Sequence, residues 1–269
     1  MADWRPMLNC REGGFPRIMG VVNVTPDSFH PDSRFPGTAE AISRAVKMVE
    51  HGADWIDVGG ESTRPGAASV PPEEEAARVL PVIEGIRAKM PEVCISIDTR
   101  RAYVAGLALE AGADMVNDIS RLSDTEMLEV IVEHGCPICI MHMRGLPENM
   151  QDNPRYEDVV SEVRSSLGRV TERLLEKGID PSHIVVDPGI GFGKMLEHNL
   201  ALLSAGKDIS PDSAMPLMWG VSRKSMFRDF LGRESSDDRL SGTLGVAAMA
   251  QAKGVDIIRV HDVADHTDL

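Results

Sequence analysis

The feature that most constrains the fold of this chain is a repeated alternation between short apolar runs and longer stretches rich in Ala, Glu, Leu and Arg. Eight apolar runs, rich in β-branched residues, occur at 17–22, 55–59, 93–98, 114–118, 137–143, 183–187, 217–221 and 256–260. Helical patterns lie between them near 38–51, 72–89, 101–111, 124–134, 157–177, 195–206 and 239–252. Because these runs show little polar alternation, they are typical of parallel strands covered on both faces. Eight strands at this spacing predict an α/β protein with a (β/α)8 TIM barrel, a single domain over residues 1–269 with a core at about 17–263.

A doubly wound open sheet is the alternative, because it shares the same alternation. Such a sheet would carry a Gly-rich dinucleotide loop after its first strand, and the sequence has none there. Glycines also stand one or two residues before several of the predicted strands, at Gly52, Gly112, Gly135 and Gly254. We expect them to cap the C-terminal ends of the preceding helices.

The charge balance excludes some functions. The chain has 28 Lys and Arg against 42 Asp and Glu, a formal net charge of −14. This argues against general nucleic-acid binding and against binding to an anionic membrane surface, although a local basic cluster can still hold a small anion. No apolar run approaches the roughly 20 residues of a membrane span. Four cysteines are too few for a disulfide framework at this size, so we expect a cytoplasmic protein.

Polar side chains follow the predicted strands where each strand ends. The polar stretches are 23–29, 57–66, 98–99, 117–118, 141–143, 187–194, 222–225 and 259–262. In a barrel these stretches converge on one rim, where the active sites of this fold lie. Each stretch alone is also compatible with capping or solvated surface, but eight together indicate a binding site.

The first group of these side chains suits a flat heterocycle. Asp98, Asn117 and Asp187 offer carboxylates and an amide to ring N–H donors and a carbonyl. We expect Lys224 to reach a ring carbonyl or nitrogen, with the apolar side chains of Met141 and Phe192 against the ring faces. The competing interpretation of Asp98 and Asp187 is a buried carboxylate tied to a lysine or to backbone N–H groups.

A second group suits an anion such as phosphate or pyrophosphate. It consists of Asn23, Arg64, Arg259 and His261. The two groups together predict a substrate with a hydrogen-bonding ring and a charged leaving group.

Three other motifs favour structural interpretations. The glycine-rich stretch at 189–194 is not a phosphate-binding P-loop, because Pro188 precedes it and Met195 replaces the Ser or Thr. Cys136 and Cys139 resemble a redox pair, but they lead into a strand where residues three apart point to opposite faces. We therefore expect buried structural thiols. The acidic run at 73–75 is most simply the first turn of a helix.

With these residues assembled, the sequence resembles the dihydropteroate synthase family of pterin-binding enzymes. The resemblance runs in family order from about residue 17 to 263. It rests on NVTPDSF at 23–29, IDVGGESTRPGA at 56–67, SIDT at 96–99, VND at 116–118, MHM at 141–143, DPGIGFGK at 187–194, SRKS at 222–225 and RVHDV at 259–263. The stretch HPDSRF at 30–35 departs from the family pattern, which leaves Asp32 and Arg34 as candidates to order that loop.

The resemblance implies a TIM barrel that joins p-aminobenzoate to hydroxymethyl-dihydropterin pyrophosphate, giving dihydropteroate and pyrophosphate. It implies that the pterin is held by Asp98, Asn117, Asp187 and Lys224, with Met141 and Phe192 beside it. It implies Mg²⁺ as the cofactor, bound on the pyrophosphate with help from Asn23, and phosphates gripped by Arg259 and His261. It places Thr63, Arg64, Ser222 and Ser225 near the pyrophosphate or the amine substrate, with Phe29 and Pro65 on closing loops.

Two other functions compete with this one. A pterin-binding methyltransferase would share the barrel and the pterin-binding set, but it needs no grip on pyrophosphate. The charges at 222–224 and 259–261 therefore favour the synthase. A non-catalytic homologue that binds pterin and serves a partner protein is the second alternative. For the synthase we expect small-molecule substrates, no nucleic acid, no membrane and a homodimer.

Overall fold

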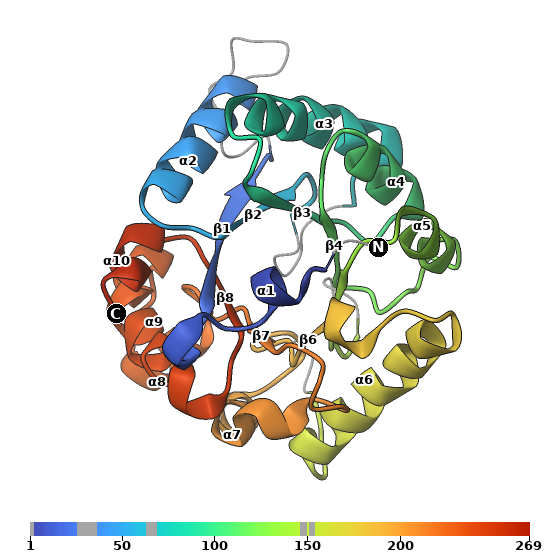
Figure 1. Ribbon diagram of the computed structural model, residues 1–269. Coiled ribbons are helices and arrows are strands. Elements are labelled where there is room, and N and C mark those ends of the chain that lie inside the picture. The colour runs from blue at the N-terminus through green and yellow to red at the C-terminus, as the bar shows by residue number, and fades with distance from the viewer. Residues whose placement is uncertain (1–2, 26–36, 63–68, 146–149, 151–153) are drawn as a thin grey trace.

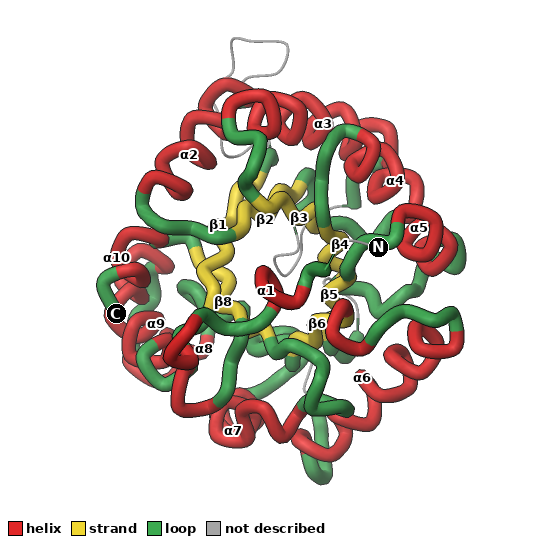
Figure 2. Tube along the Cα trace, viewed as in Figure 1, coloured by secondary structure: helices red, strands yellow, loops and turns green. Residues whose placement is uncertain are grey.

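The predicted barrel is confirmed by the computed structural model, which describes residues 3–25, 37–62, 69–145, 150 and 154–269. Eight parallel strands form one sheet in the order β6-β5-β4-β3-β2-β1-β8-β7. A bridge between Val186 and Leu217 joins the two ends of this order, so the sheet is nearly closed (Figure 2). The strands are β1 (Arg17–Asn23), β2 (Trp55–Gly59), β3 (Cys94–Asp98), β4 (Met115–Asp118), β5 (Ile138–Met141), β6 (Ile184–Asp187), β7 (Met218–Trp219) and β8 (Ile257–Val260).

The described residues form ten α-helices, and all except the first surround the strands as an outer ring (Figure 1). They are α1 (Arg5–Leu8), α2 (Thr38–Glu50), α3 (Pro72–Lys89), α4 (Ala102–Glu110), α5 (Met127–His134), α6 (Val159–Glu176), α7 (Leu196–Ala205), α8 (Met226–Leu231), α9 (Leu240–Ala247) and α10 (Val263–Thr267). The glycines expected to cap helix ends, at Gly52, Gly112, Gly135 and Gly254, all have positive φ, as that position requires. Of these helices, α1, α8 and α10 fall outside the predicted helical patterns. No described helix is both long and apolar enough to cross a membrane.

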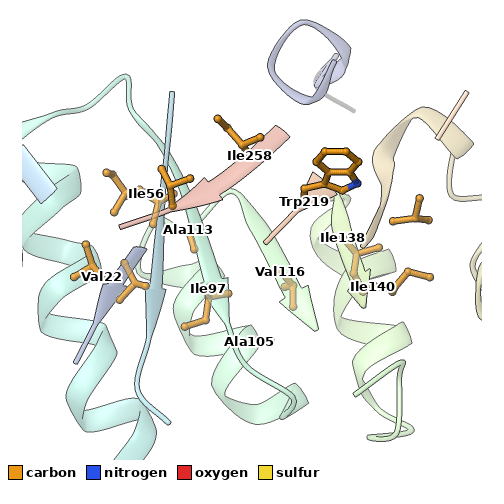
Figure 3. Close-up of a cluster of buried hydrophobic side chains, with 14 of the residues drawn as sticks. Val22, Ile56, Ile97, Ala105, Ala113, Val116, Ile138, Ile140, Trp219 and Ile258 are labelled. Atoms are coloured by element: carbon orange, nitrogen blue, oxygen red, sulfur yellow. The ribbon is translucent and has the colours of Figure 1, made fainter. Parts of the chain in front are cut away.

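Side chains alternate between the two faces of the closed sheet, because successive residues of a strand point to opposite faces. The outward set packs against the helices, and Figure 3 shows Ile56, Ile97, Val116 and Ile140 among its members. The inward set at the start of the strands is also apolar and buried: Met19, Trp55, Cys94, Met115, Cys139, Val185, Met218 and Ile257. Further along the strands the inward positions become polar, and this change marks the end of the barrel that can hold a polar ligand.

The helix α1 closes the other end of the barrel, where the strands begin (Figure 1). Leu8 is fully buried against the inward apolar set, and Trp4 stacks near Trp55 with ring centroids 6.2 Å apart. The Nε1 of Trp55 donates to the carbonyl of Met7 at 2.8 Å. The chain segment before the first strand is therefore part of the core.

The cysteines behave as expected from the strand period. Cys136 packs in the outward cluster and Cys139 in the inward one, so their side chains lie on opposite sides of the barrel wall. Both are buried and free, and burial raises the pKa of the Cys136 thiol to about 12. The structural interpretation of this pair is confirmed.

Candidate active site

An ionic cluster occupies the barrel interior above the apolar layer, on β2, β3, β4 and β8. Nε of Arg259 donates to Asp57 at 2.6 Å, and Nη2 of Arg259 donates to Asp98 at 2.6 Å. Nδ2 of Asn117 donates to the same Asp57 carboxylate at 3.3 Å. The guanidinium of Arg259 therefore binds two carboxylates, and one of these, Asp57, links it to the amide of Asn117 on a fourth strand.

Asp187 and Lys224 face this cluster from β6 and from the loop after β7. Oδ1 of Asp187 accepts from the N–H of Gly189 at 2.7 Å, which fixes the carboxylate at the end of its strand. Nζ of Lys224 lies 3.8 Å from the centre of the Phe192 ring, a cation–π geometry. The structure thus places Lys224 directly beside Phe192, two residues that were each expected to contact the heterocycle.

The loop after β6 is locked against the loop after β5. Gly189 has φ 66°, and a Cβ at this position would lie 1.9 Å from the carbonyl oxygen of His142, so only glycine fits. Lys194 is buried, and its Nζ donates to the carbonyls of His142, Gly189 and Phe192 at 3.2, 2.9 and 2.9 Å. These contacts hold Phe192 in place beside the apolar cluster that contains Met141.

Burial dominates the electrostatics of this interior. It raises the pKa of the Asp98 carboxyl to about 7, although the charge of Arg259 opposes this shift. It also raises the pKa of Asp187, against the Gly189 hydrogen bond and the charge of Lys224. The pKa of Lys224 falls to about 8 because burial outweighs the attraction of Asp187. Burial opposes the charge of Arg259 too, but Asp57 and Asp98 raise its pKa above the ordinary value.

Several polar atoms in the barrel interior make no hydrogen bond to the described residues. Oδ1 of Asp57 and Oδ1 of Asn117 are buried and have no hydrogen-bond donor among the described residues. In the same described set, Nζ of Lys224 and Nη1 of Arg259 make no hydrogen bond. Buried polar atoms are nearly always paired, so unpaired acceptors and donors here indicate a polar ligand or water.

The predicted anion group is only partly assembled. Arg259 belongs to the carboxylate cluster, so the expectation of two separate groups is corrected: one arginine is common to both. The ring of His261 lies against the hydroxyl of Ser222, with Nδ1 at 3.0 Å from Oγ. Burial, followed by the charges of Arg259 and Arg44, lowers the pKa of His261 to about 4. His261 is therefore neutral near pH 7, and it offers a phosphate a hydrogen bond rather than a charge.

The sequence analysis counted the charge of Arg223 among those that would grip pyrophosphate, and the structure corrects this expectation. Its guanidinium pairs with Asp262 at 2.6 Å and with Asp237 at 2.8 Å, so its charge is already neutralised. Arg44 on α2 is the cation near His261 that sequence reasoning missed. Nothing in the helix pattern of 38–51 distinguished this arginine from a solvated one.

Two of the remaining predicted residues, Asn23 and Ser225, stand at the same end of the barrel. Asn23 ends β1, and Ser225 directly precedes α8. Phe29, Thr63, Arg64 and Pro65 lie outside the described residues, as do the loop candidates Asp32 and Arg34.

Two functional candidates were missed by the sequence analysis. Asp57 is fully buried and bonds to both Arg259 and Asn117. Its signal was present, since a carboxylate stands in the middle of the apolar run 55–59. Lys194 was named only as part of the stretch 187–194 and was given no role of its own, so its part in joining two loops was missed.

The donor set limits what kind of metal the site can hold. Among the described residues, no group of three or more His, Cys, Asp and Glu side chains is arranged to hold a metal ion. Asn23 offers one side-chain oxygen at the rim. Because Mg²⁺ in phosphate sites is bound through one or two protein oxygens, substrate phosphates and water, these residues fit an ion that arrives with its phosphate ligand.

The chain is similar in sequence and fold to proteins of known activity. The model of a family described as pterin binding enzyme matches residues 19–261. A dihydropteroate synthase of Escherichia coli strain K12 is 44% identical over 250 residues, which cover 93% of this chain and 88% of that protein. A Xanthomonas albilineans dihydropteroate synthase, solved with 4-aminobenzoic acid, has a TM-score of 0.87 at 38% identity and covers 94% of this chain and 90% of its own. A Yersinia pestis dihydropteroate synthase in complex with a sulfonamide drug has a TM-score of 0.88 at 39% identity, with 96% and 93% covered.

Proposed function

The chain belongs to the pterin binding enzyme family, and we propose that it is a dihydropteroate synthase, which joins p-aminobenzoate to hydroxymethyl-dihydropterin pyrophosphate and releases pyrophosphate. The observation that carries this proposal is the set of Asp98, Asn117, Asp187, Lys224 and Arg259, which gathers inside the barrel with Asn117 and Asp187 buried. A hydrogen-bonding heterocycle with an anionic group requires these acceptors and cations together.

Pterin binding draws on the unpaired polar capacity of this interior. The carboxylates of Asp98 and Asp187 accept from ring N–H groups, and Lys224 donates to a ring carbonyl or nitrogen. Met141 and Phe192 pack beside the ring, where their apolar cluster excludes water. The ring is thereby oriented with its methylene carbon toward the rim.

The chemical step replaces one bond to the methylene carbon by another. The bond from carbon to the pyrophosphate oxygen breaks first, because the electron-rich pterin ring stabilises the cation that forms. The amine nitrogen of p-aminobenzoate then bonds to the carbon and loses a proton. Nη1 of Arg259 and the neutral His261 donate hydrogen bonds to the leaving oxygens, which is electrostatic rather than covalent catalysis. Mg²⁺, held by Asn23 and the phosphates, would supply further positive charge.

The amine substrate is assigned to the rim beside Ser222 and Ser225. A Xanthomonas relative was solved with 4-aminobenzoic acid and a Yersinia relative with a sulfonamide drug. Because a sulfonamide copies the aniline ring of p-aminobenzoate, sulfonamides should inhibit this enzyme by competing with that substrate.

Turnover tests the proposal directly. The protein is incubated with Mg²⁺, the pterin pyrophosphate and p-aminobenzoate, and dihydropteroate and pyrophosphate are measured. We expect product from the natural chain and from D208N, whose aspartate is exposed outside the site, and strongly reduced product from D187N. No dihydropteroate from the folded natural chain would refute the synthase, and methyl transfer to a corrinoid would establish the methyltransferase instead.

Assembly and location are also part of the proposal. Three apolar side chains are exposed on the packed helices α7 and α8, namely Leu200, Phe230 and Leu231, and such a surface supports a homodimer. Light scattering should give twice the chain mass, and F230S should lower it. The four free cysteines support a reducing cytoplasm.

A further inference from the structure

A second polar cavity lies outside the barrel interior, between the loops after β4 and β5 and the first half of α6. Its volume is about 340 Å³. Its described lining includes Arg121, Arg144 and Arg169 together with His142, Glu162 and Ser166. None of these residues belongs to the pterin, amine or pyrophosphate groups of the proposed reaction.

Positive charge exceeds negative charge in this cavity. Glu162 is the only carboxylate among its described lining residues, and it pairs with Arg144 at 2.8 Å. Arg121 and Arg169 have no carboxylate partner within the described part of the chain. Among the described residues, Arg121 donates only to the hydroxyl of Ser166, at 3.0 Å. Neither guanidinium therefore forms an ion pair within the described part of the chain.

Arg121 is held in this position at a cost. Burial, and then the charge of Arg169, lowers the pKa of Arg121, although the charge of Asp118 opposes this shift. Arg121 and Leu122 also have φ of 62° and 58°, a region that residues other than glycine rarely adopt. The buried carboxylate of Asp118 maintains this turn by accepting from the N–H of Leu122 at 2.6 Å.

Neutral donors complete the lining. The hydroxyls of Ser161, Ser165 and Ser166 come from one side of α6. Burial, followed by the charge of Lys194, lowers the pKa of His142 to about 2, so its ring adds no charge near neutral pH. Guanidinium groups and hydroxyls are the side chains that most often bind phosphate oxygens.

We propose that this cavity is an accessory binding site for a small phosphate-bearing ligand, separate from the site of the proposed reaction. A small ligand is favoured over a nucleic acid because the cavity is about 340 Å³ in volume and the chain's net charge of −14 repels a long polyanion. The ligand's phosphate group would supply a counter-ion that Arg121 and Arg169 do not have among the described residues. The inference does not depend on the reaction proposed above.

Calorimetric titration with inorganic phosphate, and separately with glycerol phosphate, tests the site at low ionic strength. The variants are R169Q, R121Q and the matched control R164Q, which removes the same charge from α6 at a position outside the cavity lining. We expect R169Q and R121Q each to weaken binding about five- to tenfold, since each removes a charge-assisted hydrogen bond. R164Q should leave binding unchanged.

R169Q keeps the test interpretable if R121Q misfolds, because Arg169 is exposed and makes no hydrogen bond within the described residues. Phosphate bound elsewhere, including at the reaction site, would be retained equally in all variants. Equal affinity in the natural chain, R169Q and R164Q, or no phosphate binding by the natural chain, would overturn the proposal. Tighter binding of one probe over the other would show whether the free ion or its ester is preferred.

Discussion

At the scale of single residues, Arg259 shows how closely stability and function are joined in this barrel. It is the cation that the two buried carboxylates of Asp57 and Asp98 share, and one of its nitrogens stays available. A buried charge is tolerated only when it is paired. The same side chain therefore supports the folded state and serves the leaving group in the proposed reaction.

We predict that R259M lowers the free energy of unfolding by about 3–5 kcal/mol, because it leaves two buried carboxylates unpaired. Urea denaturation would measure this loss. Adding D57N to R259M should recover part of the stability, since one uncompensated charge is then removed. The comparison variant R223M breaks half-exposed ion pairs and should cost less. Equal losses in R259M and R223M would contradict the role assigned to Arg259.

A second prediction concerns pH. Because the pKa of Asp98 is raised to about 7, the carboxyl is protonated below that pH and ionised above it. The ionised form accepts from two ring N–H groups, so affinity for a bare pterin should rise as the pH rises through about 7. The free energy of unfolding should change in the opposite direction. Because the pKa of Asp98 is raised in the folded state, this carboxyl stabilises the fold below its unfolded-state pKa, and the stabilisation is lost as the pH rises through its folded-state pKa.

Calorimetry and urea denaturation across this range would measure both trends. In D98N both pH steps should disappear, whereas D208N should keep them. Affinity that falls with pH in the natural chain would contradict the assignment of Asp98 as an acceptor for the ring.

Sequence alone located most of this site, because polar residues at strand ends had to meet once the barrel was predicted. Asp98, Asn117 and Asp187 were identified this way. The partnership of Arg259 with Asp57 was not, because the two residues are 202 positions apart and their contact depends on strand register. The neutral state of His261 also depends on burial, which a single sequence does not reveal.

At the scale of elements, a set of ion pairs anchors the segment that follows β2. Arg101 at the start of α4 contacts Glu61 before the segment, and Ser69 and the carbonyl of Val70 after it. It also pairs with Glu75 of α3. The acidic run at 73–75 forms the first turn of α3, as predicted, and within it Glu75 is fully buried while Glu73 and Glu74 are exposed. Helical periodicity turns one residue in a short acidic run toward the barrel.

We predict that R101M raises the KM for p-aminobenzoate several-fold, since Thr63, Arg64 and Pro65 are assigned to the segment between these anchors. Steady-state kinetics with each substrate varied in turn would measure the effect. The control R100M loses, among the described residues, contacts to Glu61 and Ser69 only, so it should have a smaller effect. A change in R101M confined to the KM for the pterin substrate would contradict this assignment.

At the scale of the whole molecule, acidic residues have opposite roles at the two ends of the barrel. Asp54, Asp114 and Asp256 lie just before strands β2, β4 and β8, and each accepts a backbone N–H at 2.8 Å from the neighbouring element. Each also pairs with an arginine or a lysine. These acids close the base of the barrel, whereas Asp57 at the other end keeps an oxygen without a hydrogen-bond donor among the described residues. Residue type in the sequence does not separate the two roles; position along the strand does.

The last prediction follows from this polarity. Leu8 of α1 is fully buried against Met19, Trp55 and Met115 at the base, far along the strands from the ionic cluster. L8A should lower the free energy of unfolding by about 2–5 kcal/mol, because it removes buried methyl groups and leaves a cavity. The value of kcat/KM measured well below the unfolding temperature should stay unchanged. L175A, at a side chain that is 37% exposed, should change stability by about 0.5 kcal/mol or less. An L8A as stable as the natural chain would contradict the packing role of Leu8, and a folded L8A that loses turnover would show that the base and the site are not independent.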